Sequence, residues 1–232
     1  MTEPSAGFLF TFFNPAVAAA HWREIAWGML VTVGVGVAVV ATGLAVGLAL
    51  AVARATGRPG WRLPVMAFSD VMRSLPPLVI IILLYFGLPS VGLPLSSFAA
   101  TWLSLSMVLA AYAQESIWAS LRSLPSGQLE AARSTGLGWW PAMRWVMLPQ
   151  ALRRAVPPLT NRVISTTKNT ALGSVVALSE ILSNAQAASA VAGNPTPLTV
   201  GAFLYLLVFL PIVIGSRWLE RYAGRHGTGH GS

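Results

Sequence analysis

Several ionisable side chains stand inside long apolar stretches of this sequence, where a charge is costly and is therefore a candidate for function. They are Asp70, Arg73, Glu115, Lys168 and Glu180. A basic side chain can donate hydrogen bonds to a carboxylate, and an acidic one can accept them from an ammonium group. Such a set could therefore serve a zwitterionic solute that crosses a membrane.

Two pairs among these residues also have a purely structural interpretation. Asp70 and Arg73 are three residues apart, so on a helix they could pair with each other near the inner interface. Glu115 and Lys168 could form a buried ion pair if their helices are neighbours. Alternatively, these two could line a path together with Asn169 and Thr170. The residues alone leave both interpretations open.

The sequence lacks the residues that several other kinds of site need. It has no cysteine, and its three histidines, His21, His226 and His230, stand near its ends. We therefore expect no disulfide and no buried metal site. It also has no Gly-x-x-x-x-Gly-Lys-Ser/Thr phosphate loop. We expect no cofactor in this chain, and any ATP has to be bound by another protein.

The composition indicates that lipid is the solvent for much of the chain. Of the 232 residues, 55% are hydrophobic and 9% are charged, whereas soluble domains carry about 25% charged residues. The net charge of +8 does not suggest nucleic acid, because the charges are sparse and gather at the ends of apolar runs. The composition predicts an all-α integral membrane protein.

Apolar runs long enough to cross a bilayer predict about five transmembrane helices. We place them near residues 25–53, 63–86, 97–121, 157–178 and 198–218. The first run contains no charge and is too long for a cleaved signal peptide, so we expect it to remain as a helix. The uncharged connections 87–97 and 183–197 are predicted as a turn and a loop.

The basic residues predict the orientation of these helices. Arginines are concentrated in residues 54–62, 122–154 and 217–225, while the connections 87–97 and 183–197 hold neither Lys nor Arg. Because basic connections stay in the cytoplasm, we expect the N-terminus outside and the C-terminus inside. We divide the chain into an extracytoplasmic segment 1–22, a single transmembrane domain 23–222 and a disordered cytoplasmic tail 223–232.

Gly43 and Gly47 have the small-x-x-x-small spacing that lets two helices approach closely. We favour ordinary packing inside the subunit over a specific dimer contact as the reason for this spacing.

The basic connection 122–154 predicts two short helices with a bend. Ser126 is suited to cap the first helix, and Glu130 lies in its early part, where a carboxylate is favourable. Gly136 is expected to end this helix, and Pro149 to separate the second helix from the next span. The segment could lie on the lipid headgroups, as its tryptophans suggest, or it could be a rigid knob that docks into another protein.

The same segment carries a motif. Glu130-Ala-Ala followed by Gly136 and Leu148-Pro-Gln150 resembles the "EAA…G" signature of ABC importer permeases. Further stretches in the same order resemble the histidine- and glutamine-type permeases of polar amino acid uptake. They are Arg73-Ser-Leu-Pro-Pro-Leu78, Tyr85-Phe-Gly-Leu-Pro89, Ala111-Tyr-Ala-Gln-Glu115, Pro157-Pro-Leu-Thr-Asn161 and Lys168-Asn-Thr-Ala-Leu172.

The resemblance implies a type I ABC importer permease fold in the bacterial cytoplasmic membrane, with a cytoplasmic coupling helix that docks into an ATP-binding subunit. The implied coupling residues are Gln128, Glu130, Ala131, Ala132, Gly136, Leu148, Pro149 and Gln150. The implied partners are a dimer of ATPase subunits that binds ATP and Mg, a second permease chain and an extracytoplasmic solute-binding protein. The candidates for the substrate path are Arg73, Pro76, Glu115, Lys168, Asn169, Thr170 and Glu180.

The sequence departs from the family pattern near these candidates. Ser74 and Leu75 stand where the family usually has Gly and Thr, and Asn169 stands where it usually has Asp. Trp118 and Ala119 replace a usual Arg-Gly pair. We expect the substrate to be an amino acid or a related small polar solute, with its identity open.

Two other classes of function were weighed against the permease. A secondary carrier would be favoured by an inverted repeat, which the sequence does not show, and an odd number of spans does not divide into equal halves. An intramembrane enzyme would need paired aspartates or a histidine metal site inside the spans. Only the permease requires the motif from Glu130 to Gly136.

Overall fold

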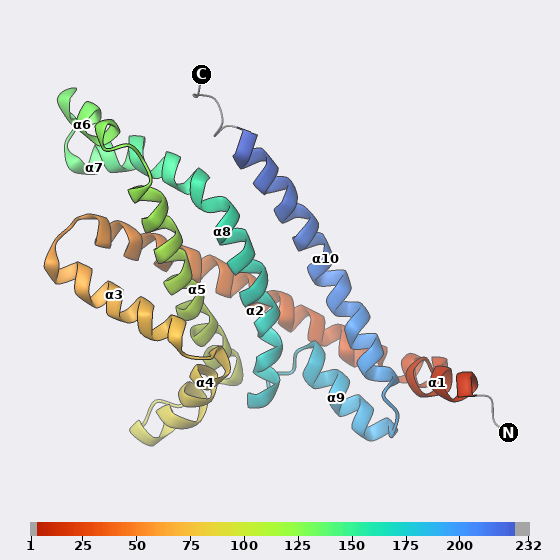
Figure 1. Ribbon diagram of the computed structural model, residues 1–232. Helices are drawn as coiled ribbons and strands as arrows, with labels where there is room; N and C mark the ends of the chain where they lie inside the picture. The colour runs from red at the N-terminus through yellow and green to blue at the C-terminus, as the bar shows by residue number, and fades with distance from the viewer. Residues whose placement is uncertain (1–3, 226–232) are drawn as a thin grey trace. The chain divides into compact units, whose positions relative to one another are not determined.

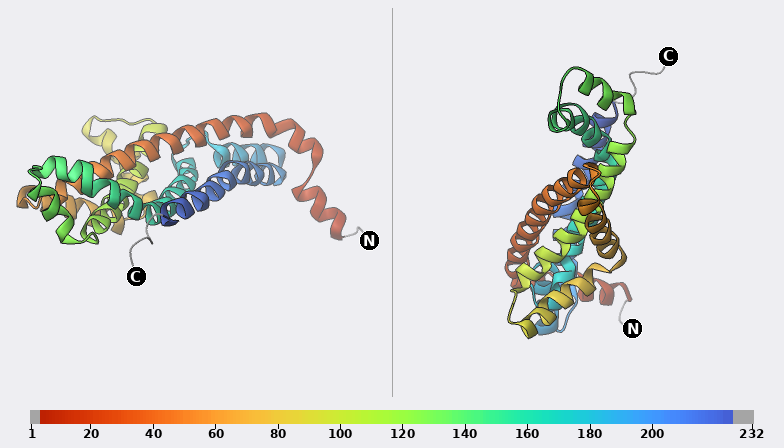
Figure 2. Two further views of the ribbon diagram at one scale, coloured as in Figure 1. Left: turned by 90° about the horizontal axis from the view of Figure 1, so that it is seen from above. Right: turned by 90° about the vertical axis from the view of Figure 1, so that its left-hand side faces the viewer.

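The computed structural model describes residues 4–225, which form helices and turns without a strand in that range (Figure 1). The α-helices are α1 (Pro4–Phe12), α2 (Pro15–Ala55), α3 (Pro59–Ser74), α4 (Pro77–Ile82), α5 (Ser97–Arg122), α6 (Ser126–Ser134), α7 (Trp139–Ala142), α8 (Leu148–Lys168), α9 (Ile181–Ala192) and α10 (Thr196–Arg225). The π-helical segments are η1 (Leu83–Gly87) and η3 (Met143–Met147), and the 3₁₀ segments are η2 (Leu88–Val91) and η4 (Asn169–Val176). The all-α prediction is confirmed, and Figure 2 shows the same helices from two further directions.

Length and composition identify the membrane-spanning helices only in part. The stretches Gly7–Ala55 and Thr196–Arg221 are long and apolar enough, and two broken pairs of helices bring the number to four if each pair is one span. The predicted span not included in these four is 97–121, which is α5. Its 26 residues measure about 39 Å, more than the hydrocarbon core of about 30 Å. Serines, Gln114 and Glu115 interrupt its apolar run, so composition alone does not mark it as a span.

The chain divides into two compact units, each built from segments distant in sequence. The first unit contains Met1–Val39, Pro77–Leu105 and Thr167–Val213, and the second contains Val40–Pro76, Ser106–Thr166 and Ile214–Ser232. In the first unit Ile25 of α2 is buried with Ile181 and Ala185 of α9, and Val200, Leu204 and Val208 of α10 pack against them.

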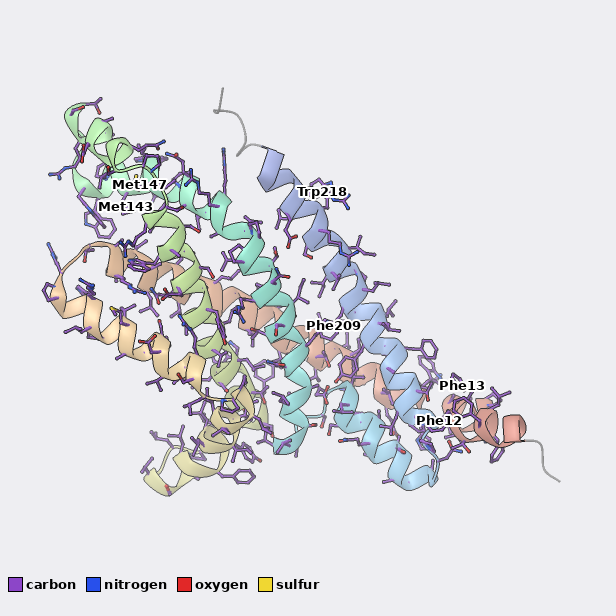
Figure 3. The ribbon with its side chains drawn as sticks, in the orientation of Figure 1. Phe12, Phe13, Met143, Met147, Phe209 and Trp218 are labelled. Atoms are coloured by element: carbon purple, nitrogen blue, oxygen red, sulfur yellow. The ribbon has the colours of Figure 1, made fainter. Side chains whose placement is uncertain are left out.

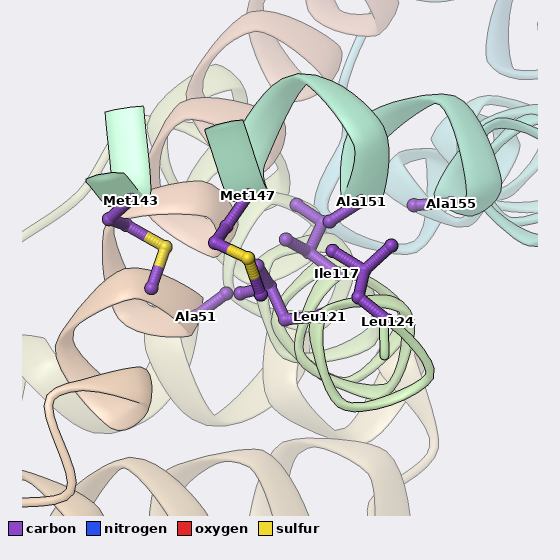
Figure 4. Packing of buried hydrophobic residues seen from close by; sticks show 8 residues of the cluster. All are labelled: Ala51, Ile117, Leu121, Leu124, Met143, Met147, Ala151 and Ala155. Carbon is purple, nitrogen blue, oxygen red and sulfur yellow. The ribbon is translucent and has the colours of Figure 1, made fainter. Parts of the chain in front are cut away.

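The second unit has a core that joins four helical segments. It consists of Ala51, Ile117, Leu121, Leu124, Met143, Met147, Ala151 and Ala155, all buried. Figure 3 locates Met143 and Met147 between α7 and α8, and Figure 4 shows their side chains directed towards Ala51 and Leu121. This core fixes the ends of α2 and α5 against η3 and the start of α8.

Gly43 and Gly47 let α2 and α5 approach closely in the second unit. A Cβ atom added to Gly43 would lie 2.9 Å from the side chain of Leu109, and one added to Gly47 would lie 2.5 Å from the Cβ of Ala113. The interpretation that this spacing serves packing inside the subunit is confirmed.

Several predicted boundaries were wrong. α2 begins at Pro15 instead of residue 25, so helix also occupies most of the predicted segment 1–22. The predicted loop 183–197 is mainly α9, because its apolar and small residues form a helix capped by Glu180. The tail predicted from residue 223 begins inside α10, which runs to Arg225, and residues 226–232 lie outside the described part.

The helix boundaries predicted from prolines before Lys168 are wrong. Pro149 does not separate two helices, and Pro157 and Pro158 lie inside α8 instead of starting a span. The chain is helical from Trp139 to Lys168, with a wider π-helical turn directly before Pro149. A wider turn gives room near the carbonyl of Trp145, which the ring of Pro149 would meet in a regular α-helix.

We predict that Gly47→Ala lowers the stability of the chain, although alanine normally favours a helix by about 0.5–1 kcal/mol. The new methyl group would meet Ala113 and the carbonyl of Ala110, at 2.5 and 2.9 Å. Overpacking of this kind costs about 1–3 kcal/mol, so a lower melting temperature is expected in detergent. Gly34→Ala is the matched control, since no atom lies within 4 Å of its added Cβ. Equal melting temperatures for both variants would contradict the packing argument.

Candidate functional site

The helix α6 presents a small-residue face with one carboxylate. Glu130, Ala131 and Ser134 are exposed, while Ala132 is 8% exposed and Gln128 is half-buried. Gly127 completes the exposed face, since residues three and four apart lie on one side of a helix. Close approach by another protein is therefore possible along this face.

Gly136 forms the turn that follows α6. Its φ of +88° is in the left-handed region, which favours glycine, and its N–H donates to the carbonyl of Arg133 at 3.0 Å. No atom lies within 4 Å of an added Cβ, so the backbone conformation and not the space requires glycine here. The prediction that Gly136 ends this helix is confirmed. The prediction of Ser126 as N-cap was wrong by one residue, because Pro125 holds that position.

The motif residues Leu148, Pro149 and Gln150 lie at the start of α8. Leu148 packs against the core of the second unit, and so does Leu129 of α6 itself. The Gln150 side-chain amide donates to the carbonyl of Val146 in its own helix at 2.8 Å, while Pro149 is exposed. Arg154 donates to the carbonyl of Ser123 at 2.8 Å and so ties α8 to the connection before α6.

Glu115 is the centre of an ion-pair cluster in the second unit. Its Oε2 atom lies 2.8 Å from Nη1 of Arg54 on α2 and 3.4 Å from Nη1 of Arg73 on α3. The Arg54 guanidinium also lies 3.5 Å from the ring centroid of Trp118. One carboxylate therefore compensates two arginines on different helices.

This cluster rules out two pairings that the sequence left open as structural interpretations. The partners of Glu115 are arginines and not Lys168. Arg73 pairs with Glu115 and not with Asp70, which is exposed and has no ion-pair partner within residues 4–225. Arg54 follows an apolar run in the sequence, which predicts an exposed residue in a basic connection. Its side chain is only 8% exposed.

A second polar contact in this unit joins Ser69 and Gln114, and it was not predicted from the sequence. The Ser69 hydroxyl donates to Oε1 of Gln114 at 2.6 Å, and both residues are fully buried. The two residues lie on α3 and α5, and their polarity inside apolar runs was the available signal.

Glu180 is a buried helix cap in the first unit. Its Oε1 accepts from the N–H of Ser183 at 2.8 Å, and its Oε2 accepts from the hydroxyl of Tyr205 on α10. Tyr205 was not predicted from the sequence as a partner of Glu180. Thr32 was not predicted either, and its hydroxyl accepts from the N–H of Ile181 at 3.3 Å. Both carboxylate oxygens of Glu180 are thus engaged in holding α9 in place.

Lys168 is the last residue of α8, and its side chain is exposed. It lines an open cavity of about 670 Å³ in the first unit, together with apolar residues of α10. The α10 residues are Ala202, Tyr205, Leu206, Phe209, Leu210 and Val213, of which Figure 3 labels Phe209. Asn169 and Thr170 begin the 3₁₀ segment η4, and the Thr170 hydroxyl donates to the carbonyl of Thr167 at 2.8 Å.

Pro76 marks the break in the second predicted span. α3 ends at Ser74, and Leu75 is extended, with φ −90° and ψ 136°. A residue before proline is disfavoured in the helical region, which explains why the helix stops here and α4 starts at Pro77.

Comparisons with known proteins agree on one family. Residues 43–224 match the family described as "binding-protein-dependent transport system inner membrane component". The probable glutamine ABC transporter permease protein GlnP of Bacillus subtilis is 35% identical over 67% of this chain and 73% of its own length. The glutamine transport system permease protein GlnP of Escherichia coli K12 is 33% identical over 84% of this chain and 90% of its own length.

A solved structure supports the same relationship. The crystal structure of an amino acid ABC transporter with histidines superposes with a TM-score of 0.77 and 28% sequence identity. The match covers 86% of this chain and 94% of that one.

We predict that Glu115→Gln destabilises the chain more than Glu130→Gln does. The first change leaves Arg54 buried without its counter-charge, whereas Glu130 is exposed. Breaking a fully buried pair costs about 3–5 kcal/mol. Because 35% of the Glu115 side chain is exposed, we expect a loss of about 1–2 kcal/mol, measured as a lower melting temperature in detergent. A Glu115→Gln variant as stable as Glu130→Gln would exclude the structural role.

Proposed function

We propose a function for this chain from the premise that it belongs to the family of inner membrane components of binding-protein-dependent transport systems. Its relatives in polar amino acid uptake include glutamine permeases, so the resemblance predicted from the sequence is confirmed. The proposed function is that of the permease subunit of an ATP-driven importer, which forms the translocation path for amino acids or related small polar solutes.

The observation that carries this proposal is the exposed face of α6. The face has one carboxylate, Glu130, beside the small residues Gly127 and Ala131, and the left-handed turn at Gly136 sets where it ends. It lies inside the residues that match the family. We infer that α6 docks into an ATPase subunit through this face, while Ala132 is buried and Leu129 packs against the core of the second unit, as Leu148 does.

The partners follow from this proposal. ATP and Mg are bound by a dimer of ATPase subunits, a second permease chain completes the path, and a solute-binding protein delivers the substrate outside. The chain itself contributes no phosphate loop. The arginine-rich connections are proposed to face the cytoplasm, with the N-terminus outside and the C-terminus inside.

For the substrate path, Lys168 is the strongest candidate. Its ammonium group stands at an open cavity with mainly apolar walls, where it could bind a substrate carboxylate. Asn169 is half-buried beside it. Arg73, Glu115 and Glu180 are engaged in contacts that hold helices together, which favours a structural role for them. Pro76 and Thr170 remain candidates for the substrate path, because each lies where a regular α-helix ends: Pro76 after α3, and Thr170 in the 3₁₀ segment after α8.

We predict that Glu130→Lys abolishes ATP-driven uptake and co-purification of the ATPase, while membrane insertion is unchanged. The reversed charge lies on the exposed face proposed for docking. Glu24→Lys is the control, because this carboxylate is also exposed but belongs to α2. Uptake at the wild-type rate by Glu130→Lys would show that α6 does not make the coupling contact.

Two uncharged variants at Gly136 test the backbone turn after α6 separately from the charge of Glu130, with the same uptake measurement. Gly136→Val should disturb the turn and lower uptake at least tenfold, since a β-branched residue is strongly disfavoured at φ +88°. Gly136→Asn should retain most uptake, because asparagine tolerates left-handed backbone.

We predict that Lys168→Ala lowers substrate-dependent uptake at least tenfold while the ATPase still co-purifies. The side chain lines the cavity and is distant in sequence from α6. Lys168→Arg keeps the positive charge and should retain part of the activity. Wild-type uptake by Lys168→Ala would remove this residue from the substrate path.

A further inference from the structure

A second cavity, of about 410 Å³, lies in the second unit and is lined by three arginines. Arg54 is at the end of α2, Arg62 in the first part of α3, and Arg122 is the last residue of α5. The remaining lining residues are Ala55, Gly57, Trp118, Leu121, Met143 and Met147. None of these belongs to the proposed substrate path or to the exposed face of α6.

Arg54 is an incompletely satisfied group at this cavity. Its side chain is only 8% exposed, and its Nε atom is buried with no hydrogen-bond partner among the described residues. Its Nη1 is engaged by Glu115, and its guanidinium lies against the ring of Trp118. A buried charged donor without an acceptor is costly, and an anion in the cavity that Arg54 lines would add to the negative charge that Glu115 supplies.

The charges around the cavity favour an anion as its occupant. Arg54, Arg62 and Arg122 line it, and Glu115 is the acidic group paired with Arg54. Arg73 contacts that same carboxylate from α3. Arg122 also lies over Trp118, at 5.1 Å from the ring centroid, so two guanidinium groups flank one indole. Positive charge therefore exceeds negative charge around the cavity.

The apolar walls distinguish a lipid from a free anion. Leu121, Met143 and Met147 belong to the buried core shown in Figure 4, and all three also line the cavity. The ends of α2 and α5, where apolar helix gives way to arginine, correspond to the depth of the lipid headgroups. A lipid at this depth can place its phosphate at the arginines and its acyl chain along the apolar side of the cavity, which a small inorganic ion does not use.

We propose that this cavity binds the phosphate group of an anionic membrane lipid, with Arg54, Arg62 and Arg122 as donors and the two methionines against the start of an acyl chain. Arginine suits this ligand, because its planar group donates several hydrogen bonds to phosphate oxygens.

The occupant would also act on the segment that carries α6. Met143 and Met147 lie on η3, which contacts α6 directly. A lipid held between the arginines and these methionines would therefore restrain η3 and, through it, the orientation of α6. This goes beyond the proposed function, since lipid binding can be measured without a substrate or an ATPase.

The test is native mass spectrometry of the full chain in mild detergent, titrated with phosphatidylglycerol or phosphatidylcholine. Wild-type chain is expected to retain phosphatidylglycerol more tightly than phosphatidylcholine. Each direct contact between a partly exposed arginine of the cavity and the lipid phosphate contributes about fivefold in affinity. The double variant R62Q/R122Q should therefore bind phosphatidylglycerol about 25-fold more weakly. The control R58Q removes an exposed arginine of the same connection that does not line the cavity, and should bind as the wild type does.

Three results would overturn the proposal: equal binding of the two lipids, unchanged binding by R62Q/R122Q, or full displacement of phosphatidylglycerol by millimolar inorganic phosphate. The last result would assign the site to a free ion. The melting temperature in phosphatidylcholine shows whether the double variant is folded. If it is not, R62Q alone changes one exposed side chain and should weaken binding about fivefold.

Discussion

The carboxylate of Glu115 is the interaction on which the polar organisation of the second unit depends. It compensates Arg54, buried at the end of α2, and Arg73 on α3, so a single acidic group joins three helices. Two guanidinium groups this close would otherwise repel, and Arg54 would be left charged against Trp118. The close approach of α2 to α5 at Gly47 allows this arrangement, because larger residues would push the two helices apart.

The same unit explains how a short helix can present a defined surface. α6 has nine residues, and an isolated helix of that length is marginal in water. Its stability has to come from packing: Leu129 packs against the core that contains Met143 and Met147, and Ala132 is buried. The outward face can therefore be polar and small, since it is not needed to hold the helix. One side of α6 thus supplies its folding energy, and the opposite side is free for the docking contact that we propose.

Periodic and local features were predictable from the sequence, while tertiary choices were not. The all-α membrane fold class follows from hydropathy. The Gly43–Gly47 packing follows from residue size, and the turn at Gly136 follows from backbone preference. The partner of Glu115 could not be predicted, because a carboxylate is equally suited to an arginine or a lysine and only the packing of α2 decides. The predicted loop 183–197 is wrong because a lack of charge does not distinguish a loop from a helix of small and apolar residues. The predicted break at Pro149 is wrong because a proline near the start of a helical segment does not end the helix.

The π-helical turn η3 has a consequence for sequence register. Met143, Met147, Ala151 and Ala155 recur every four residues and are all buried in one core. On a regular α-helix a four-residue repeat drifts by about 40° per step, since four residues exceed one turn of 3.6. A π-helical turn contains more residues and rotates the stripe back. Removing a single residue between 143 and 147 would therefore convert this turn to regular α-helix with little rotation of the stripe, whereas the same removal inside α8 would rotate its two parts relative to each other by about 100°.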